Sequence, residues 1–151
     1  SLHDALPISL MERLEEAISC FDLTIENDPK YLNAYKNKTL ILKKLGKLKE
    51  GIECIDKALQ ISPTFRHGYN VKGGILKLMG DNEGALKCFE AAIELNKEDS
   101  EAQYNKALTL EAMGKKKEAS EYYEAAYNLN PRLRSSSPTN QKSHQDQCQI
   151  F

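Results

Sequence analysis

The sequence lacks a long apolar run and an excess of charge of either sign. Its longest apolar runs span only a few residues, whereas a membrane-crossing helix needs roughly 20. The N-terminus lacks the charged and apolar regions of a secretory signal, and a formal net charge of −1 leaves no basic face for nucleic acid. We therefore expect a globular protein of one-domain size with no membrane span and no nucleic-acid partner. Four cysteines without an export signal favour a cytoplasmic location.

Residue patterns typical of catalysis and of metal binding are also missing. The sequence contains no GxSxG, HExxH or P-loop spacing. It has neither a CxxC pair nor a His/Cys cluster that would hold zinc. Of three histidines, His3 and His144 lie near the ends, and only His67 lies in the central part of the chain. We expect a protein that is not an enzyme and that binds no cofactor and no metal.

The central part of the chain repeats itself every 34 residues. Shifting the sequence by this period aligns Gly46, Gly80 and Gly114, each preceded by Leu or Met and, four residues earlier, by Leu. After each glycine, apolar residues recur at three- and four-residue steps, as they do on one face of a helix. These aligned columns hold Gly51, Ala85 and Ala119; Ile55, Phe89 and Tyr123; Ala58, Ala92 and Ala126; and Ile61, Leu95 and Leu129, while Ala17, Phe21 and Thr24 continue the first three in an earlier unit.

Each unit predicts two helices joined by a tight turn. Glycine supplies the left-handed conformation that ends the first helix, and Pro63 and Pro131 mark the break after a second helix. Small residues let the two helices approach closely, and large neighbours fill the space beside them. Gly73 and Gly74 lie inside a first helix, so we interpret them as packing residues and not as a phosphate-cradling pair. A lone hairpin cannot bury its apolar face, so the units must stack.

This pattern resembles the tetratricopeptide repeat family, whose unit is a 34-residue helix–turn–helix. The resemblance covers about residues 12 to 131 and departs most in the last unit, where Gln103 replaces the first-helix aromatic of Tyr35 and Tyr69. It implies an all-α, right-handed superhelical solenoid of antiparallel helix–turn–helix hairpins, about three and a half units long. The expected divisions are an irregular leader, a partial unit with a second helix only, three full units and a disordered tail: 1–9, 10–31, 32–65, 66–99, 100–131 and 132–151.

Both ends of the sequence depart from the repeat. Residues 1–9 include Pro7 and fit no repeat column, so they are either a natural leader or a cloning remnant. The absence of a partner helix at either end predicts weak self-association and suggests a piece of a longer array. The last four residues match a C-a-a-X prenylation box at Cys148. A chance tetrapeptide is the favoured interpretation, because no strong polybasic run precedes it.

In proteins of this family the first helices line a concave groove that holds an extended peptide or a partner's helix. The resemblance implies that positions on all three first helices of this chain bind such a ligand. They are Asn33, Lys36, Asn37, Leu40 and Lys43 in the first full unit; His67, Asn70, Val71 and Lys77 in the second; and Glu101, Tyr104, Asn105 and Leu108 in the third. The side chains of such a groove change from basic and amide-bearing in the first full unit to acidic in the third. The alternative is that these residues are only the solvated side of the helices.

The predicted function is a non-catalytic scaffold for protein–protein interaction, with a protein or peptide ligand and a preference for acidic groups. The two-carboxylate clamp of some family members is not expected, because Val71 stands in an asparagine column and Asn33 and Glu101 stand where lysines are needed. Two alternatives remain. The chain is a purely structural segment of a larger array, or it is a regulatory repeat domain of a larger protein.

Three cysteines, Cys20, Cys54 and Cys88, share one column of the repeat. Matching columns of stacked units lie at least about 10 Å apart, beyond the roughly 7 Å between Cα atoms that a disulfide allows. We interpret these cysteines as small apolar packing residues.

We expect all four thiols to react with a thiol reagent after denaturation, because no cysteine is engaged in a disulfide. A chelator should leave the thermal unfolding curve unchanged. Loss of helicity on adding the chelator would contradict the packing interpretation.

Overall fold

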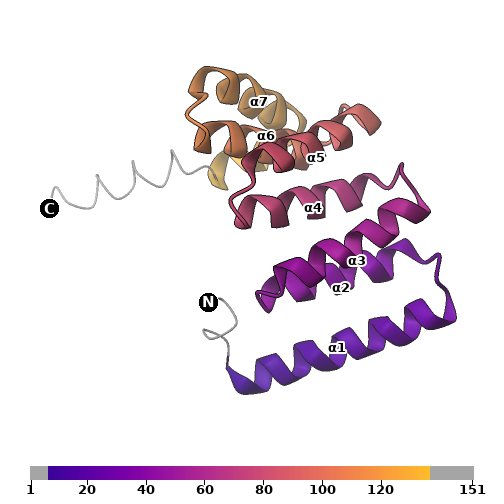
Figure 1. Cartoon of the computed structure of the whole chain (residues 1–151). Coiled ribbons are helices and arrows are strands. Elements are labelled where there is room, and N and C mark those ends of the chain that lie inside the picture. Colours follow the sequence, from indigo (N-terminus) through magenta and orange to yellow (C-terminus); the bar gives the residue numbers. More distant parts are fainter. Residues whose placement is uncertain (1–6, 137–151) are drawn as a thin grey trace, which may run out of the picture.

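A computed structural model describes residues 7–136 as seven α-helices followed by a short 3₁₀ helix (Figure 1). This confirms the all-α fold predicted from the repeat. The elements are α1 (Ile8–Asn27), α2 (Leu32–Lys44), α3 (Leu48–Ile61), α4 (Arg66–Leu78), α5 (Asn82–Leu95), α6 (Ser100–Ala112), α7 (Lys116–Leu129) and η1 (Pro131–Ser136).

The helices stack in sequence order as a solenoid of hairpins (Figure 1). Helices α2 and α3, α4 and α5, and α6 and α7 form the three full hairpins, and each second helix also packs on the first helix of the next unit. The first helices contact one another, α2 with α4 and α4 with α6. Among the described residues, the second helices do not contact one another to the same extent, neither α3 with α5 nor α5 with α7. The first helices therefore lie on the inner side of the curved stack.

Glycine ends each of the three first helices, as the sequence predicts. Gly46, Gly80 and Gly114 have φ angles of 73°, 84° and 80°, in the left-handed region that costs a residue with a Cβ about 1–2 kcal/mol. The amide that follows each glycine bonds back to a carbonyl near the helix end, as from Asp81 to Leu76 at 2.9 Å. The turn thus satisfies carbonyl groups that the helix itself leaves unpaired.

Helix α1 is longer than the others because its sequence departs from the glycine column. Glu12 stands 34 residues before Gly46, and a glutamate is strained where glycine is not. The chain instead continues as one helix of 20 residues, against 13 or 14 in α2 to α7. It begins at Ile8, inside the leader predicted to be irregular, with Pro7 just before its first turn.

The core alternates large and small side chains between the helices of a hairpin. Ile55, Phe89 and Ile75 are fully buried, as are the alanines of the Ala58, Ala92 column. A Cβ placed on Gly73 would lie only 2.7 Å from the Phe89 ring. The packing interpretation is confirmed for Gly73, since α4 and α5 approach too closely there for any side chain.

The cysteine column behaves differently in its three units. Cys54 and Cys88 are buried at 8% exposure each, as predicted, and this burial raises the pKa of both thiols above the usual value. Cys20 is exposed, so the packing prediction is wrong for this residue. The reason is that Cys54 packs on α2 and donates to the Tyr35 carbonyl, 3.6 Å away, whereas within residues 7–136 no first helix of the same unit packs on α1.

The segment after α7 is more ordered than the sequence predicts. The sequence places residues 132–136 in a disordered tail, but they belong to η1, which packs on α7. The Arg134 guanidinium lies 5.0 Å from the centre of the Tyr127 ring and donates to Glu124 at 3.0 Å. The C-a-a-X box at Cys148 and most of the predicted leader lie outside the described residues. Among residues 7–136, no helix is both long and apolar enough to cross a bilayer.

Replacing Gly80 with alanine should lower the free energy of unfolding by about 1–2 kcal/mol. No atom lies within 4 Å of the added Cβ, so the loss reflects backbone strain alone. Urea unfolding followed by circular dichroism measures it. The control variant Gly80→Asn should lose less free energy of unfolding than Gly80→Ala, because asparagine adopts the left-handed conformation more readily than alanine. Equal stability of the alanine variant and the wild type would contradict the turn assignment.

Candidate functional site

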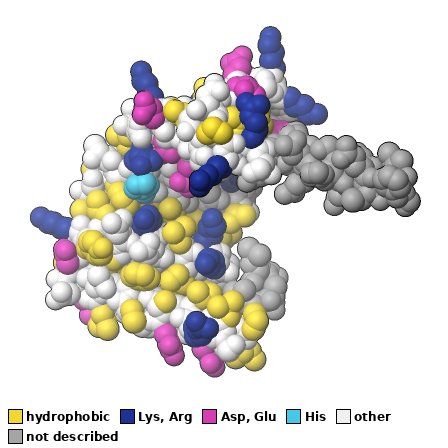
Figure 2. Space-filling view, turned by 180° about the vertical axis from the view of Figure 1, so that it is seen from behind, with side chains coloured by type: hydrophobic (Ala, Val, Ile, Leu, Met, Phe, Trp, Pro, Cys, Tyr) yellow, Lys and Arg dark blue, Asp and Glu magenta, His cyan; other side chains and the backbone are white. Residues whose placement is uncertain are grey.

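The predicted groove residues lie on α2, α4 and α6, the helices on the inner side of the stack. Figure 2 shows the molecule from the side of α2, α4 and α6, where Lys and Arg side chains gather over the middle of the face with hydrophobic side chains between them. The repeat aligns the predicted residues of the three helices in columns, such as Lys43 with Lys77 and Leu40 with Leu108. Twelve of the thirteen are exposed or half-buried: Asn33, Lys36, Asn37, Leu40, Lys43, His67, Val71, Lys77, Glu101, Tyr104, Asn105 and Leu108.

Asn70 is the exception, because its side chain is buried at 5% exposure. Its Nδ2 donates to Oδ2 of Asp99 at 2.9 Å, so this amide group holds the protein together and does not lie free on the surface. Its Oδ1 is buried and accepts no hydrogen bond among the described residues.

Asp99 ties the beginning of α4 to the beginning of α6. Its Oδ1 accepts from the Ala102 amide at 3.0 Å as the N-cap of α6, and its Oδ2 pairs with Arg66, the first residue of α4. Burial by itself raises the pKa of this carboxyl, but the bonds from Ala102, Arg66 and Asn70 outweigh it and hold the pKa below its usual range. Arg66 also lies 3.2 Å from Nε2 of His67. This network fixes the relative positions of two inner helices.

A second set of ion pairs, which the sequence analysis missed, joins each second helix to the next first helix. Three lysines and three acids, each set 34 residues apart, form one ladder. The pairs are Lys38–Asp22 at 2.5 Å, Lys72–Asp56 at 2.7 Å and Lys106–Glu90 at 3.0 Å. The 34-residue repeat that aligns the glycines also aligns these charged columns, although charged side chains are by default interpreted as solvated surface.

The last step of the ladder also includes an aromatic side chain. Lys106 donates to the Tyr122 hydroxyl at 2.9 Å and lies 4.1 Å from the centre of the Tyr122 ring. Tyr122 stands in the column that holds Cys54 and Cys88 in earlier units. Burial lowers the pKa of Lys106, but its bonds to Tyr122 and Glu90 outweigh this and keep the pKa above its usual value.

In contrast, the inner-face lysines have no ion pair within residues 7–136. None of Lys36, Lys43 and Lys77 lies within 4.0 Å of a carboxylate oxygen there. Burial lowers the pKa of Lys77, although the charge of Glu111 in the same repeat column partly opposes this. The Lys43 ammonium reaches from α2 to a point 4.0 Å from an ideal Cβ on Gly74 of α4. The three lysines of α2 and α4 thus differ from the paired lysines of the ladder.

The far end of the face is aromatic and acidic. The Tyr104 ring packs edge-on against Tyr123, with 5.5 Å between centroids, and Tyr127 lies 6.3 Å away. The Tyr123 hydroxyl donates to Glu111 at 2.6 Å. Burial raises the pKa of Tyr104 and, together with the Glu111 bond, that of Tyr123. Tyr104 is thus half-buried in a cluster between α6 and α7.

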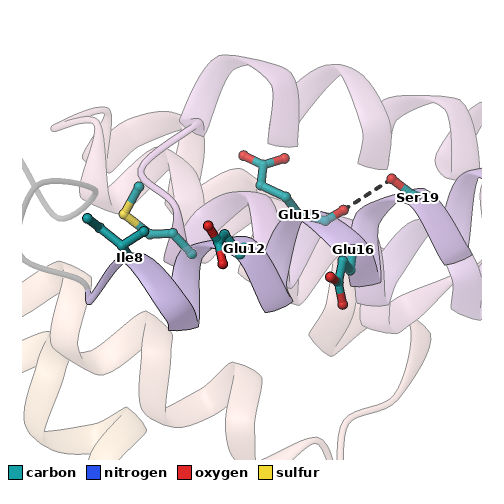
Figure 3. Close-up of a pocket in the computed structure, with 6 residues that line it drawn as sticks. Ile8, Glu12, Glu15, Glu16 and Ser19 are labelled. Atoms are coloured by element: carbon teal, nitrogen blue, oxygen red, sulfur yellow. Dashed lines mark hydrogen bonds between the residues drawn. The ribbon is translucent and has the colours of Figure 1, made fainter.

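A shallow depression on α1 offers no comparable chemistry. Figure 3 shows its lining, and all six side chains come from this one helix. Glu15 is already paired with Lys47 at 2.9 Å, and the Ser19 hydroxyl donates to the Glu15 backbone carbonyl. The described residues contain no group of three or more His, Cys, Asp or Glu side chains placed to hold a metal ion.

The stacked hairpins, the glycine turns and the inner face define an α-helical repeat protein. The chain belongs to the tetratricopeptide repeat family: two family models of that description match residues 32–65 and 79–138, together more than half of its length. Domains of this family are typically non-catalytic. No curated protein matches the sequence significantly.

Solved structures of MamA proteins share the fold. One, a crystal structure of MamA, is 22% identical and covers 83% of this chain and 76% of its own, with a TM-score of 0.71. A MamA structure from Desulfovibrio magneticus RS-1 is 16% identical and covers 83% of this chain and 71% of its own, with a TM-score of 0.70. At these identities the similarity establishes the arrangement of the helices and nothing about the ligand.

The Asp99 network predicts a pH-dependent contribution to stability. At pH 7, Asp99→Asn should lower the free energy of unfolding by about 2 kcal/mol, since the variant loses charge-assisted bonds to a buried group. The folded-state pKa is lowered, so the contribution is complete above the unfolded value of about 3.9 and is lost as the pH falls through the folded pKa.

Urea unfolding at a series of pH values tests this prediction. The difference between wild type and Asp99→Asn should stay constant from pH 7 to about pH 5 and shrink below about pH 4. A variant as stable as the wild type at pH 7 would show that the network does not stabilise the fold.

Proposed function

We propose that this chain is a non-catalytic scaffold that binds a segment of another protein on the inner face of α2, α4 and α6. The ligand is an extended peptide or a helix, and acidic segments are favoured at the α2–α4 end. The observation that carries this proposal is the difference between two sets of lysines. Those facing the preceding second helix, such as Lys38 and Lys72, are paired, whereas Lys36, Lys43 and Lys77 have no such pair among the described residues.

The surroundings of these lysines suit a peptide chain. Lys36, Lys43 and Lys77 lie on neighbouring helices, so their fields add at a chain bound across the face. Asn37 and Asn105 are half-buried and offer both donors and acceptors to a peptide backbone. Leu40, Val71 and Leu108 supply half-buried apolar surface. Exposed charge contacts contribute less than about 1 kcal/mol each, so we expect micromolar affinity that weakens with salt.

A second candidate function is a purely structural segment of a larger array, and one observation favours it. Ala17 and Phe21 of α1 are only half-buried, although later members of their columns are fully buried: Ala85 in the Ala17 column, and Ile55 and Phe89 in the Phe21 column. This face of α1 therefore has room for a further first helix, supplied by the same chain or by another protein. On this reading the inner face has no ligand.

The test uses labelled ten-residue peptides with leucine at one central position and an equal mixture of Glu and Ala elsewhere. We expect these peptides to bind the wild type at least about tenfold more tightly than a matched Lys/Ala mixture, by fluorescence polarisation in low salt. The combined change Lys36→Glu, Lys43→Glu and Lys77→Gln should abolish this preference. Glutamine is used at position 77 because a new glutamate would face Glu111.

The matched control makes the same change in net charge on the outer helices: Lys49→Glu, Lys57→Glu and Lys87→Gln, all at exposed positions of α3 and α5. It should keep the preference for acidic peptides, and circular dichroism should show both variants folded. If the inner-face and outer-face variants show the same preference for Glu/Ala peptides, the inner face is not the binding site. The second candidate function, a purely structural segment, then replaces this proposal.

A further inference from the structure

A hollow of about 280 Å³ lies among α1, α2 and α3, the helices at the lower end of the stack in Figure 1. Its buried lining residues are Tyr35, Leu42 and Cys54, and its exposed lining residues are charged side chains of α3 such as Glu50 and Glu53. None of the thirteen predicted groove residues lines it. Since a water molecule takes roughly 30 Å³, the hollow has room for a group as large as an aromatic ring.

The third full unit has nearly the same side chains at the corresponding positions, two repeat periods later. The matching pairs are Asp22 and Glu90, Ile25 and Ile93, Lys38 and Lys106, Leu42 and Leu110, Glu50 and Glu118, and Glu53 and Glu121, while the pairs that differ are Tyr35 and Gln103, Cys54 and Tyr122, and Lys57 and Ala125. Gln103 donates to the Lys97 carbonyl as Tyr35 does to the Pro29 carbonyl, so the two side chains take the same course. The main difference is therefore that Tyr122 stands where the first full unit has Cys54.

In the third unit the Tyr122 ring covers the lysine of the ladder. The Lys106 ammonium lies 4.1 Å from the centre of this ring, and the Lys106 side chain is only 11% exposed. In the two units that have cysteine in the column, the side chains of Lys38 and Lys72 are 23% and 26% exposed. The acidic partners of Lys38 and Lys106 are almost equally exposed, at 47% and 48%. An aromatic ring beside the lysine is thus the feature that the first full unit lacks.

Lys38 also has hydrogen-bond donors to spare. An ammonium group carries three N–H donors, and among the described residues Lys38 donates to Asp22 alone. Lys106 uses a further donor for the Tyr122 hydroxyl, at 2.9 Å, while it pairs with Glu90. A hydroxyl group in the hollow can accept from Lys38 in the same way, and the ring that carries it would then lie over the cation.

We propose that this hollow binds a small phenolic molecule in the place that Tyr122 fills in the third unit. The ring packs on the buried lining and on the Lys38 ammonium, and the phenol hydroxyl accepts a hydrogen bond from Lys38. A partner's tyrosine would bring its backbone up to the exposed carboxylates of Glu50 and Glu53, whereas a free phenol would not, so the occupant is a small molecule. The hollow lies apart from the predicted groove residues, and this inference does not depend on the proposed function.

Thermal unfolding followed by circular dichroism gives a test that needs no ligand. Cys54→Tyr should raise Tm by about 2–5 °C, because the new ring fills existing space and meets Lys38. The control Cys20→Tyr adds the same side chain at an exposed position of the same repeat column and should shift Tm by less than about 2 °C. If Cys54→Tyr does not raise Tm, the hollow does not admit a ring and the proposal is overturned.

Binding is measured by titrating the full chain with p-cresol and following the methyl NMR signals of Ile25 and Leu42, which line the hollow. A ligand this small should bind with a Kd of about 1 mM. Toluene, which lacks the hydroxyl group, should bind the wild type about fivefold more weakly, because a hydrogen bond to a charged group is lost. Cys54→Tyr should abolish the p-cresol response, and Cys20→Tyr should leave it unchanged.

A third variant tests the part assigned to the lysine. Lys38→Met should remove the preference for p-cresol over toluene, since methionine keeps the apolar stem but offers no donor. A wild type that shows no response to p-cresol, or a response that survives in Cys54→Tyr, would overturn the site. Equal binding of toluene and p-cresol to the wild type would overturn the assignment of a phenol to it.

Discussion

Close approach of the two helices in each hairpin is the constraint on which the rest of the structure depends. It requires a small residue wherever a large one arrives from the partner helix, as Gly73 does against Phe89. Once that spacing is fixed, the position of the turn is fixed too, and a left-handed glycine stands there before each second helix. The stacked units then share one register, and residues 34 positions apart occupy equivalent places.

This shared register explains why lysines of similar sequence context have different roles. Lys36 and Lys38 are two residues apart on α2, so they point to different sides of the helix. Lys38 faces the preceding second helix and pairs with Asp22. Its partner is about half exposed, so the pair contributes little to stability; we attribute to it the alignment of one unit on the next. Lys36 faces away from that contact and makes no ion pair among the described residues.

The sequence predicts those features that every unit repeats and misses those that belong to one unit or to a pair of units. The glycine turns and buried Cys54 and Cys88 followed from the columns. Cys20 did not, because column reasoning assumes that each second helix has a first helix beside it. Burial of Asn70 depends on Asp99 in the next unit, and a rule for one unit cannot show it. The groove residues follow only from the resemblance to the family, and their binding role is a proposal.

Gly73 and Gly74 show where local sequence reasoning ends. Adjacent helical residues differ by about 100° around the axis, so one of two identical residues meets the Phe89 ring while its neighbour meets open space and the Lys43 ammonium. The first glycine is required by packing. The packing interpretation is wrong for the second glycine, because a side chain fits there.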